Sequence, residues 1–287
     1  MVLLQRDAGF VEVADRVWVS RHTPFDVSTS VVAGARGFVM VDTLWSERAA
    51  AAAVDAARGL GVGELVGVVD THVHFDHSLG NAAGDVAIYA HEDAAAAMPA
   101  HLAQVQQACR DDPDQHHREE MIESRVALPT HTFSSVQVVD LGDRAVELVH
   151  PGRGHTGGDV VVRLDDADVV LAGDLVEESD RSAAPGFGAE CFPMSWPLSL
   201  DLVLNLVGPD TVVVPGHGNP VGRGFVEEQR AAIGVVAETI RDLAGRGVPV
   251  ADALDAAEWP YPREELGQAV VRGYAELPRA ARHLPLL

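Results

Sequence analysis

The chain has 287 residues, of which 47% are hydrophobic, and its formal net charge is −22 at pH 7. This length supports a sizeable core, and no tract has the composition of a linker, so we expect one domain with a helical C-terminal extension. The acidic charge argues against a nucleic-acid-binding protein, because such proteins use Lys and Arg to neutralise phosphates. Two cysteines are too few for a disulfide framework or a cysteine zinc site.

The N-terminus reads MVLLQRDAGF, with only three apolar residues between Met1 and the polar residues Gln5, Arg6 and Asp7. That stretch is too short for the core of a signal peptide. Elsewhere no apolar run approaches the roughly 18–20 residues that a membrane helix requires. We therefore expect a cytoplasmic protein that binds neither membranes nor nucleic acid.

The first quarter of the chain predicts strands, then a helix, then another strand. RVWVSRH (16–22) and TSVVAGARGFVMVDT (29–43) are rich in Val and aromatic residues, and Gly34 and Gly37 break the second into a hairpin. SERAAAAAVDAARGLG (46–61) predicts a helix with Ser46 as its N-cap and Gly59 near its end. ELVGVVD (64–70) predicts a short buried strand.

The rest of the chain continues this mixture. DVAIYA (85–90) predicts a strand, and residues 92–125 predict helices with a break near Pro113. Three β-branched runs follow at 135–152, 158–174 and 210–218; DDAD (165–168) predicts a hairpin turn, and a Gly- and Pro-rich loop precedes the last run. From Phe225 onward we expect helices and a loop around 258–265. The layout is mixed α/β without the regular βα alternation of an eightfold barrel.

Good metal ligands follow four of the predicted strands. THVHFDH (71–77) holds three histidines and Asp76, and His155, Asp174 and His217 each follow a later strand. Ligand sites gather in loops at the carboxyl ends of strands in α/β folds. Imidazole suits zinc and iron, and a carboxylate can bridge two cations. Five histidines and two aspartates suffice for two metals about 3.5–4 Å apart that share a carboxylate and a hydroxide.

These motifs resemble those of the metallo-β-lactamase-fold hydrolase superfamily. The pattern H-x-H-x-D-H in THVHFDH is followed in order by GHTGGD, LAGD and VPGHG, and VMVDT with Asp42 matches the family's first motif. The resemblance runs from about Val11 to Gly218. It implies an α/β (α+β) fold, a four-layer αβ/βα sandwich of two mixed sheets flanked by helices. Residues 1–224 would be the catalytic domain, and 225–287 a helical C-terminal extension packed on it.

The resemblance also implies two groups of ligands that share one carboxylate. They would be His72, His74 and His155 for the first metal, Asp76, His77 and His217 for the second, and Asp174 as the bridge. Asp42 would support the ligand loop by hydrogen bonds without touching a metal. Asp76 is also the catalytic candidate, because it can orient the hydroxide and later carry its proton.

The expected reaction is hydrolysis by a hydroxide that bridges two divalent metal ions, zinc first, with iron or manganese as alternatives. A carboxylate at Asp174, where some true β-lactamases use Cys, favours the glyoxalase II and lactonase branch. The expected substrate is a small-molecule ester, thioester or lactone. The oligomeric state stays open, with a homodimer among the options.

Other activities remain open from the sequence. A mononuclear-iron persulfide dioxygenase of the same fold would use His72, His155 and Asp174. A β-lactam hydrolase is a second alternative, and a non-enzymatic metal-binding module a third. The second ligand set argues against the dioxygenase.

The remaining histidines and several apolar residues receive structural roles. We expect His22, His91, His101, His116 and His117 to be exposed, and His150 to be packed or to support a ligand. Pocket-wall or core positions are expected for Phe187, Cys191, Phe192, Met194 and Trp196, and helix-packing positions for Trp259, Tyr261 and Tyr274.

Overall fold

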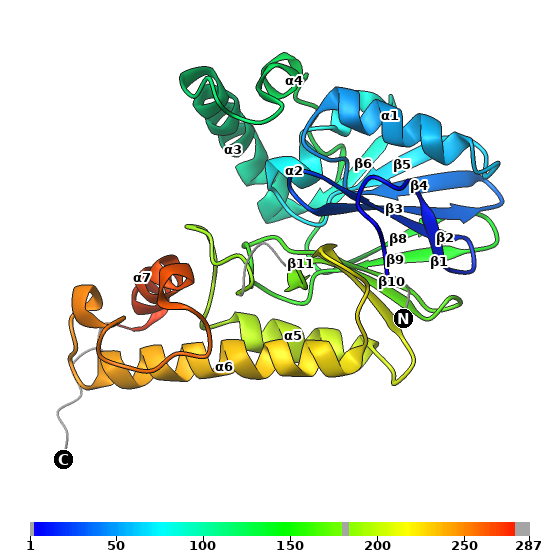
Figure 1. Cartoon of the computed structure of the whole chain (residues 1–287). Helices are drawn as coiled ribbons and strands as arrows, with labels where there is room; N and C mark the ends of the chain where they lie inside the picture. The colour runs from blue at the N-terminus through cyan, green and yellow to red at the C-terminus, as the bar shows by residue number, and fades with distance from the viewer. Residues whose placement is uncertain (1–2, 180–183, 279–287) are drawn as a thin grey trace.

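The computed structural model describes residues 3–179 and 184–278 as a four-layer sandwich, which confirms the expected fold. Two halves of a sheet face each other, and helices cover their outer faces (Figure 1). The first half is covered by α1 (Glu47–Arg58), α3 (Glu92–Asp111) and α4 (Arg118–Glu123). The second is covered by α5 (Trp196–Leu206) and α6 (Arg223–Gly245).

In the described part of the chain, strand pairing between the two sheet halves is limited to one residue pair. The strands of the first half are β1 (Val11–Ala14), β2 (Val17–His22), β3 (Val27–Gly34), β4 (Gly37–Val41), β5 (Leu65–Val69), β6 (Ala87–His91) and β7 (His131–Phe133). Those of the second are β8 (Val136–Asp140), β9 (Ala145–Val149), β10 (Val161–Leu164), β11 (Val169–Glu177) and β12 (Val212–His217). The junction pairs Val27 of β3 with His217 of β12. Both halves mix parallel and antiparallel pairs, as expected.

Period-two alternation along the strands builds three separate cores. In β4, Val39 points between the two halves while Met40 faces the outer helices. In β11, Leu171 points between the halves, whereas Val170 faces α5 and α6. Successive side chains of a strand lie on opposite faces. A strand that is buried on both faces therefore packs against the helices on one side and against the other sheet half on the other.

Several elements differ from the sequence prediction, among them the following two. The stretch before the last strand was expected to be a loop, but it contains α5, whose buried residues include Trp196, Leu200 and Val203. Pro197 fits because the first turn of a helix has no partner for its N–H group. β7 was not predicted, because three residues are too few to show alternation.

The C-terminal region is helical over its described part. α6 packs Ile233 and Ile240 into the core that also holds residues of β11 and β12, and α7 (Gly267–Glu276) packs on α6. Short 3-10 turns occupy Val250–Asp252 and Arg263–Glu265. The last part of the expected extension, 279–287, lies outside the described residues. None of the helices in the described ranges has the length and apolar character needed to cross a membrane.

The core between the two halves predicts a stability contrast within β8 and β9. Leu148 is 0% exposed in that core, so Leu148→Ala should lower the free energy of unfolding by about 2–5 kcal/mol. Val136 on the neighbouring strand is 57% exposed. Val136→Ala should therefore change the free energy of unfolding by less than about 1 kcal/mol. Urea unfolding followed by circular dichroism checks both, and equal losses would contradict the assignment of this core.

Candidate metal centre

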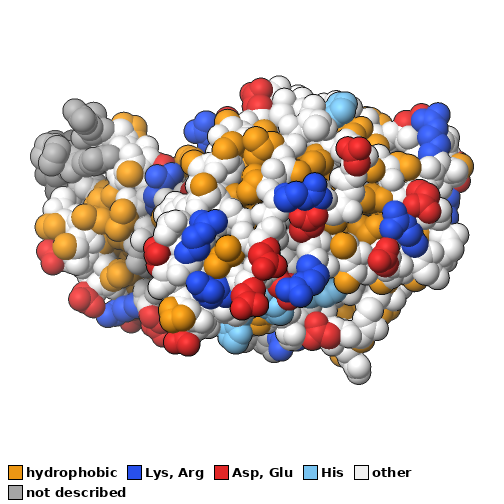
Figure 2. Space-filling model, turned by 90° about the horizontal axis from the view of Figure 1, so that it is seen from above, with side chains coloured by type: hydrophobic (Ala, Val, Ile, Leu, Met, Phe, Trp, Pro, Cys, Tyr) orange, Lys and Arg blue, Asp and Glu red, His pale blue; other side chains and the backbone are white. Residues whose placement is uncertain are grey.

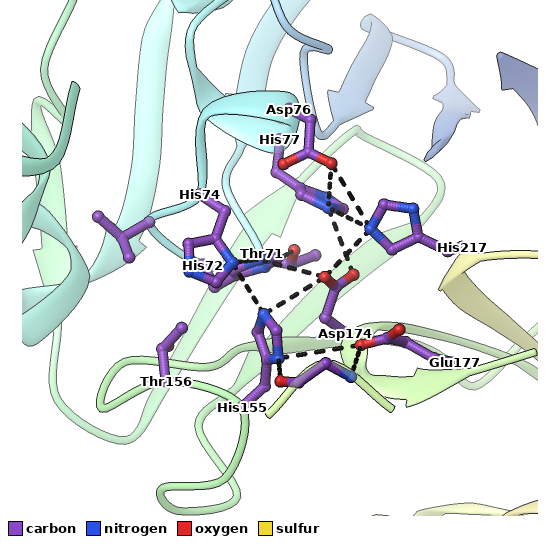
Figure 3. A network of polar contacts seen from close by, with 12 residues as sticks. Thr71, His72, His74, Asp76, His77, His155, Thr156, Asp174, Glu177 and His217 are labelled. Atoms are coloured by element: carbon purple, nitrogen blue, oxygen red, sulfur yellow. Dashed lines mark hydrogen bonds and ion pairs between the residues drawn. The ribbon is translucent and has the colours of Figure 1, made fainter. Parts of the chain in front are cut away.

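Seven of the predicted ligands lie together at the edge where the sheet halves meet (Figure 3). Within each of two groups the ligand atoms all lie within 4.8 Å of one another. The groups are His72, His74, His155 and Asp174, and Asp76, His77 and His217. Every ligand position implied by the family resemblance is therefore in this cluster.

Asp174, a member of the first group, also contacts the second. Its Oδ2 is 3.3 Å from His155 Nε2 and 3.2 Å from His217 Nε2, and its Oδ1 is 3.3 Å from His77 Nε2. A single carboxylate thus contacts both groups, which is the arrangement that a shared ligand requires.

The ends of the strands and tight loops position these side chains. β5 ends just before the loop that carries His72 and His74, and β12 ends at His217. Gly216 is required next to the cluster, because a Cβ there would collide with Asp174 Oδ1. The His155 loop is held by Asp159, whose carboxylate accepts hydrogen bonds from the N–H groups of Gly154 and Thr156 and from the Thr156 hydroxyl.

Each of the five histidines uses its outward nitrogen for a contact that orients the ring. The contacts are His72 Nδ1 with Thr71 Oγ1 (3.0 Å), His77 Nδ1 with Asp42 Oδ2 (2.8 Å), His155 Nδ1 with the Gly186 carbonyl (2.8 Å), His217 Nδ1 with the Phe25 carbonyl (3.0 Å), and His74 Nε2 with Glu190. A ring that donates from its outer nitrogen presents a lone pair on the inner one. Five lone pairs therefore face the same centre.

The inner nitrogens lie close enough together for a shared cation to bind between them. His74 Nδ1 lies 3.0 Å from His72 Nε2 and 2.8 Å from His155 Nε2, and His77 Nε2 lies 3.3 Å from His217 Nε2. In addition, Asp174 Oδ1 is buried without a hydrogen-bond partner in the described part of the chain. Facing lone pairs and an unpaired buried carboxylate oxygen fit divalent metal ions, and zinc accepts both ligand types.

Asp42 connects the supports of both groups. Its Oδ1 accepts the Thr71 N–H (2.8 Å), and its Oδ2 accepts the Thr71 hydroxyl (2.8 Å) and His77 Nδ1. Because the Thr71 hydroxyl donates to Asp42, its oxygen is left to accept from His72 Nδ1. One buried carboxylate thus sets the tautomer of a histidine in each group, and it is not itself in either group.

Burial and charge act in opposite directions on these groups. Burial lowers the pKa of His155 to about 4. Burial opposes protonation of His77 as well, but the carboxylates of Asp174, Asp42 and Asp76 outweigh it and raise the pKa of His77 to about 9. Burial raises the pKa of Glu177, at the end of β11, to about 7, with a further contribution from Asp174.

Several residues near the centre were missed or misplaced by the sequence analysis. Glu190 was not singled out, yet its carboxylate contacts His74. His101 was expected to be exposed, but its ring lies 5.2 Å from that of His74 and its Nε2 is buried. His91 is also buried and stacks on His150 at 3.9 Å, because α3 starts beneath the His155 loop.

Of the other expectations about histidines and apolar residues, one is wrong and several are confirmed. His22 is partly buried and lines a cavity with Trp45, so an exposed position was wrong for it. His116 and His117 are exposed as predicted. Cys191 and Trp196 are fully buried in the core of the second half, and Phe187 is in the same core.

Two cavities of about 630 Å³ each lie beside the first group. One is lined by His74 and His155 together with Phe187 and the C-terminal residues Glu264 and Gln268. The other is lined by Thr156, Glu190, Phe192, Arg153 and Arg272. Their volumes fall within the range of small-molecule sites.

The fold and this centre together define the protein's class. A family model described as the Metallo-beta-lactamase superfamily matches residues 22–217, more than half of the chain, so the chain belongs to this superfamily. The match ends at the last histidine of the second group.

Individual relatives have low sequence identity to this chain. A type 2 metallo-beta-lactamase from Bacillus cereus is 25% identical over 234 residues, covering 78% of this chain and 83% of the relative. One from Bacillus sp. (strain 170) is 23% identical over 235 residues, with the same two coverages.

Solved structures show the same fold. A stereoselective inverting sec-alkylsulfatase from Pseudomonas sp. has a TM-score of 0.74 at 17% identity over 93% of this chain, which spans only 50% of the sulfatase. A metallo-beta-lactamase from Pontibacter korlensis has a TM-score of 0.61 at 21% identity, covering 78% of this chain and 98% of that one. At these identities the structural likeness establishes the fold alone.

The contacts of Asp42 predict that Asp42→Asn lowers zinc affinity at both groups by about 10–100-fold. The amide has one acceptor oxygen where the carboxylate has two, so it cannot satisfy both Thr71 and His77. Asn also tolerates the positive φ of +64° found at Asp42, so the backbone should be unchanged. Competition with a chromophoric chelator measures the affinity.

Asp55→Asn is the matched control, because Asp55 is an exposed residue of α1 paired with Arg58. It should leave zinc affinity unchanged. Wild-type affinity in Asp42→Asn, with both variants showing native circular dichroism, would rule out this role for Asp42.

Proposed function

We propose that the protein is a metal-dependent hydrolase that holds two divalent ions, zinc first, and cleaves a small ester, thioester or lactone. The observation that carries the proposal is the position of Asp174 between two groups of inward-facing ligands. His72, His74 and His155 would hold one ion, Asp76, His77 and His217 the other, and Asp174 both. Iron or manganese could occupy the same nitrogen and oxygen ligands.

Divalent ions held by these residues would lower the pKa of a bound water toward neutrality and would offset the negative charge that develops on the substrate. Residues of the chain orient the attacking water and the ligand rings. Asp76 lies at the cluster and is 8% exposed, with Oδ2 3.6 Å from His217 Nε2, so its carboxylate can orient the attacking water and hold its proton. Asp42 keeps the ligand rings aligned during this transfer.

The cavities and the charge support the proposed substrate class. The cavity lined by His74 and His155 has space for a small molecule, and the net charge of −22 disfavours nucleic acid. A carboxylate at Asp174 supports the glyoxalase II and lactonase branch. A cytoplasmic location is part of the same proposal.

Hydrolysis of β-lactams is the second candidate. It is favoured by the type 2 metallo-beta-lactamases of Bacillus, which align over 78% of this chain. A persulfide dioxygenase is less well supported, because it would need only His72, His155 and Asp174, whereas the second group is also complete. A panel of esters, thioesters, lactones and β-lactams decides between the hydrolytic candidates.

The metal content of the purified protein distinguishes the proposed hydrolase from the persulfide dioxygenase. We expect the purified, metal-replete protein to bind two zinc ions per chain, and chelation to abolish hydrolysis that added zinc restores. Elemental analysis and the substrate panel measure both. One iron per chain, with oxygen uptake on a persulfide, would overturn the proposal.

The first group predicts the outcome of a double substitution. His72→Ala with His74→Ala should remove the first ion and reduce hydrolysis to background, because two of the three histidines of that group are lost. Far-UV circular dichroism should stay near native, since the three hydrophobic cores lie elsewhere.

The control is His116→Ala with His117→Ala, which removes two exposed histidines that belong to neither ligand group. It should keep full activity and metal content. Activity retained in the His72 and His74 double variant would exclude the assignment of this centre.

A further inference from the structure

Two arginines and a phenylalanine form one wall of the second cavity. Arg153 precedes His155 by two residues, and Arg272 comes from α7, far away in the sequence. The Cζ atom of each arginine lies 5.1 Å from the centroid of the Phe192 ring. All three line the cavity of about 630 Å³ that also includes Thr156 and Glu190.

This wall is built against the first group of ligands. The N–H group of Phe192 donates to the Gly154 carbonyl (2.8 Å), and Gly157 packs on the Phe192 ring. Glu190 reaches from the same cavity to His74 Nε2. A molecule in this cavity would therefore lie next to His74 and His155.

The two guanidinium groups differ from most arginines of the described chain, which have close carboxylate partners. Arg230, for example, makes two 2.7 Å bonds to Asp201. In contrast, Arg153 approaches Asp93 only at 4.0 Å, and Arg272 has no carboxylate within 4.0 Å in the described ranges. Arg272 Nε donates to the Cys191 carbonyl at 2.9 Å.

The neighbouring acids have other partners. Glu190 contacts His74, and Glu276 accepts bonds from the Met194 N–H and the Ser195 hydroxyl, each at 3.1 Å. The terminal N–H groups of Arg153 and Arg272 have no acceptor among residues 3–179 and 184–278. In a chain with a net charge of −22, two arginines beside the centre whose terminal N–H groups lack a hydrogen-bond acceptor in the described ranges are most simply explained by an anionic ligand.

We propose that Arg153 and Arg272, held over Phe192, bind a carboxylate of the substrate at a distance from the bond that is cleaved. This inference rests on the proposed hydrolysis and narrows its substrate to a small ester, thioester or lactone that carries a carboxylate. A guanidinium offers planar paired donors that match a carboxylate, and contact with an aromatic face fixes its position. Arg272 lies outside the residues matched by the family model, whereas Arg153 and Phe192 lie within them, so the C-terminal segment supplies one of the two cations of this subsite.

The test compares two esters that differ in one charge. The zinc-loaded full chain is assayed with mono-4-nitrophenyl glutarate, which is anionic, and with its methyl ester, which is neutral. Arg153→Gln and Arg272→Gln should each lower kcat/KM for the anionic ester about tenfold, through KM, because each removes a charge-assisted hydrogen bond. The neutral ester should change less than about twofold.

Arg263→Gln is the matched control, because Arg263 is an exposed arginine of the same segment, paired with Asp255 at 3.0 Å. It should leave both esters unchanged. Arg153 is 56% exposed, so its substitution keeps the test valid even if Arg272→Gln loosens α7. Asp93→Asn should strengthen anion binding, because it removes the competing carboxylate at 4.0 Å.

A binding measurement separates this inference from the proposed function. If the zinc-loaded protein cleaves neither ester, the hydrolase proposal fails for these esters, and monomethyl glutarate is then titrated by calorimetry. Weaker binding to both Gln variants by about tenfold, with Arg263→Gln unchanged, supports the subsite. Equal binding to all variants, equal binding of dimethyl glutarate, or equal loss of both esters in the kinetic assay overturns it.

Discussion

The structure depends on five imidazole rings that must point lone pairs at one small volume. Each ring is held by a contact on its outward nitrogen, and these partners are a threonine hydroxyl, two carboxylates and two backbone carbonyls. Without a cation, inner nitrogens 2.8–3.3 Å apart would repel one another unless protons lay between them. The fold therefore has to supply rigid supports for the rings from several directions.

The four-layer sandwich provides those supports. Its sheet halves are connected as paired strands at Val27 and His217, and the ends of β5 and β12 lie with Asp174 of β11 at that edge. Strands buried on both faces fix these ends, because each carries side chains into two cores. Asp42 then links the groups through Thr71 and His77. The same strands therefore stabilise the cores and align the ligands.

The sequence predicted the ligands because each belongs to a short motif near the end of a strand, and local patterns are readable there. Asp174 was expected to follow its strand, but it lies inside β11, which continues to Glu177. Asp42 and His217 are 175 positions apart, yet each has its own Gly- or Val-rich context. Glu190, His101 and Arg272 have no such context: their roles come from contacts with segments far away in the chain, at His74 and Phe192. α5 was missed because proline and glycine before it resembled a loop, and because its leucines alternate with a period of two from 198 to 206, as in a strand. The residues that it buries, Trp196, Leu200 and Val203, follow the helical period.

The central claim is that one carboxylate, Asp174, serves two groups of ligands at the junction of the sheets. A crystal structure of the zinc-loaded protein with anomalous data at the zinc edge tests it most directly. Two peaks are expected, one at His72, His74 and His155 and one at Asp76, His77 and His217, with Asp174 in contact with both. A single peak at this edge, or two peaks with Asp174 bound to neither, would contradict the account.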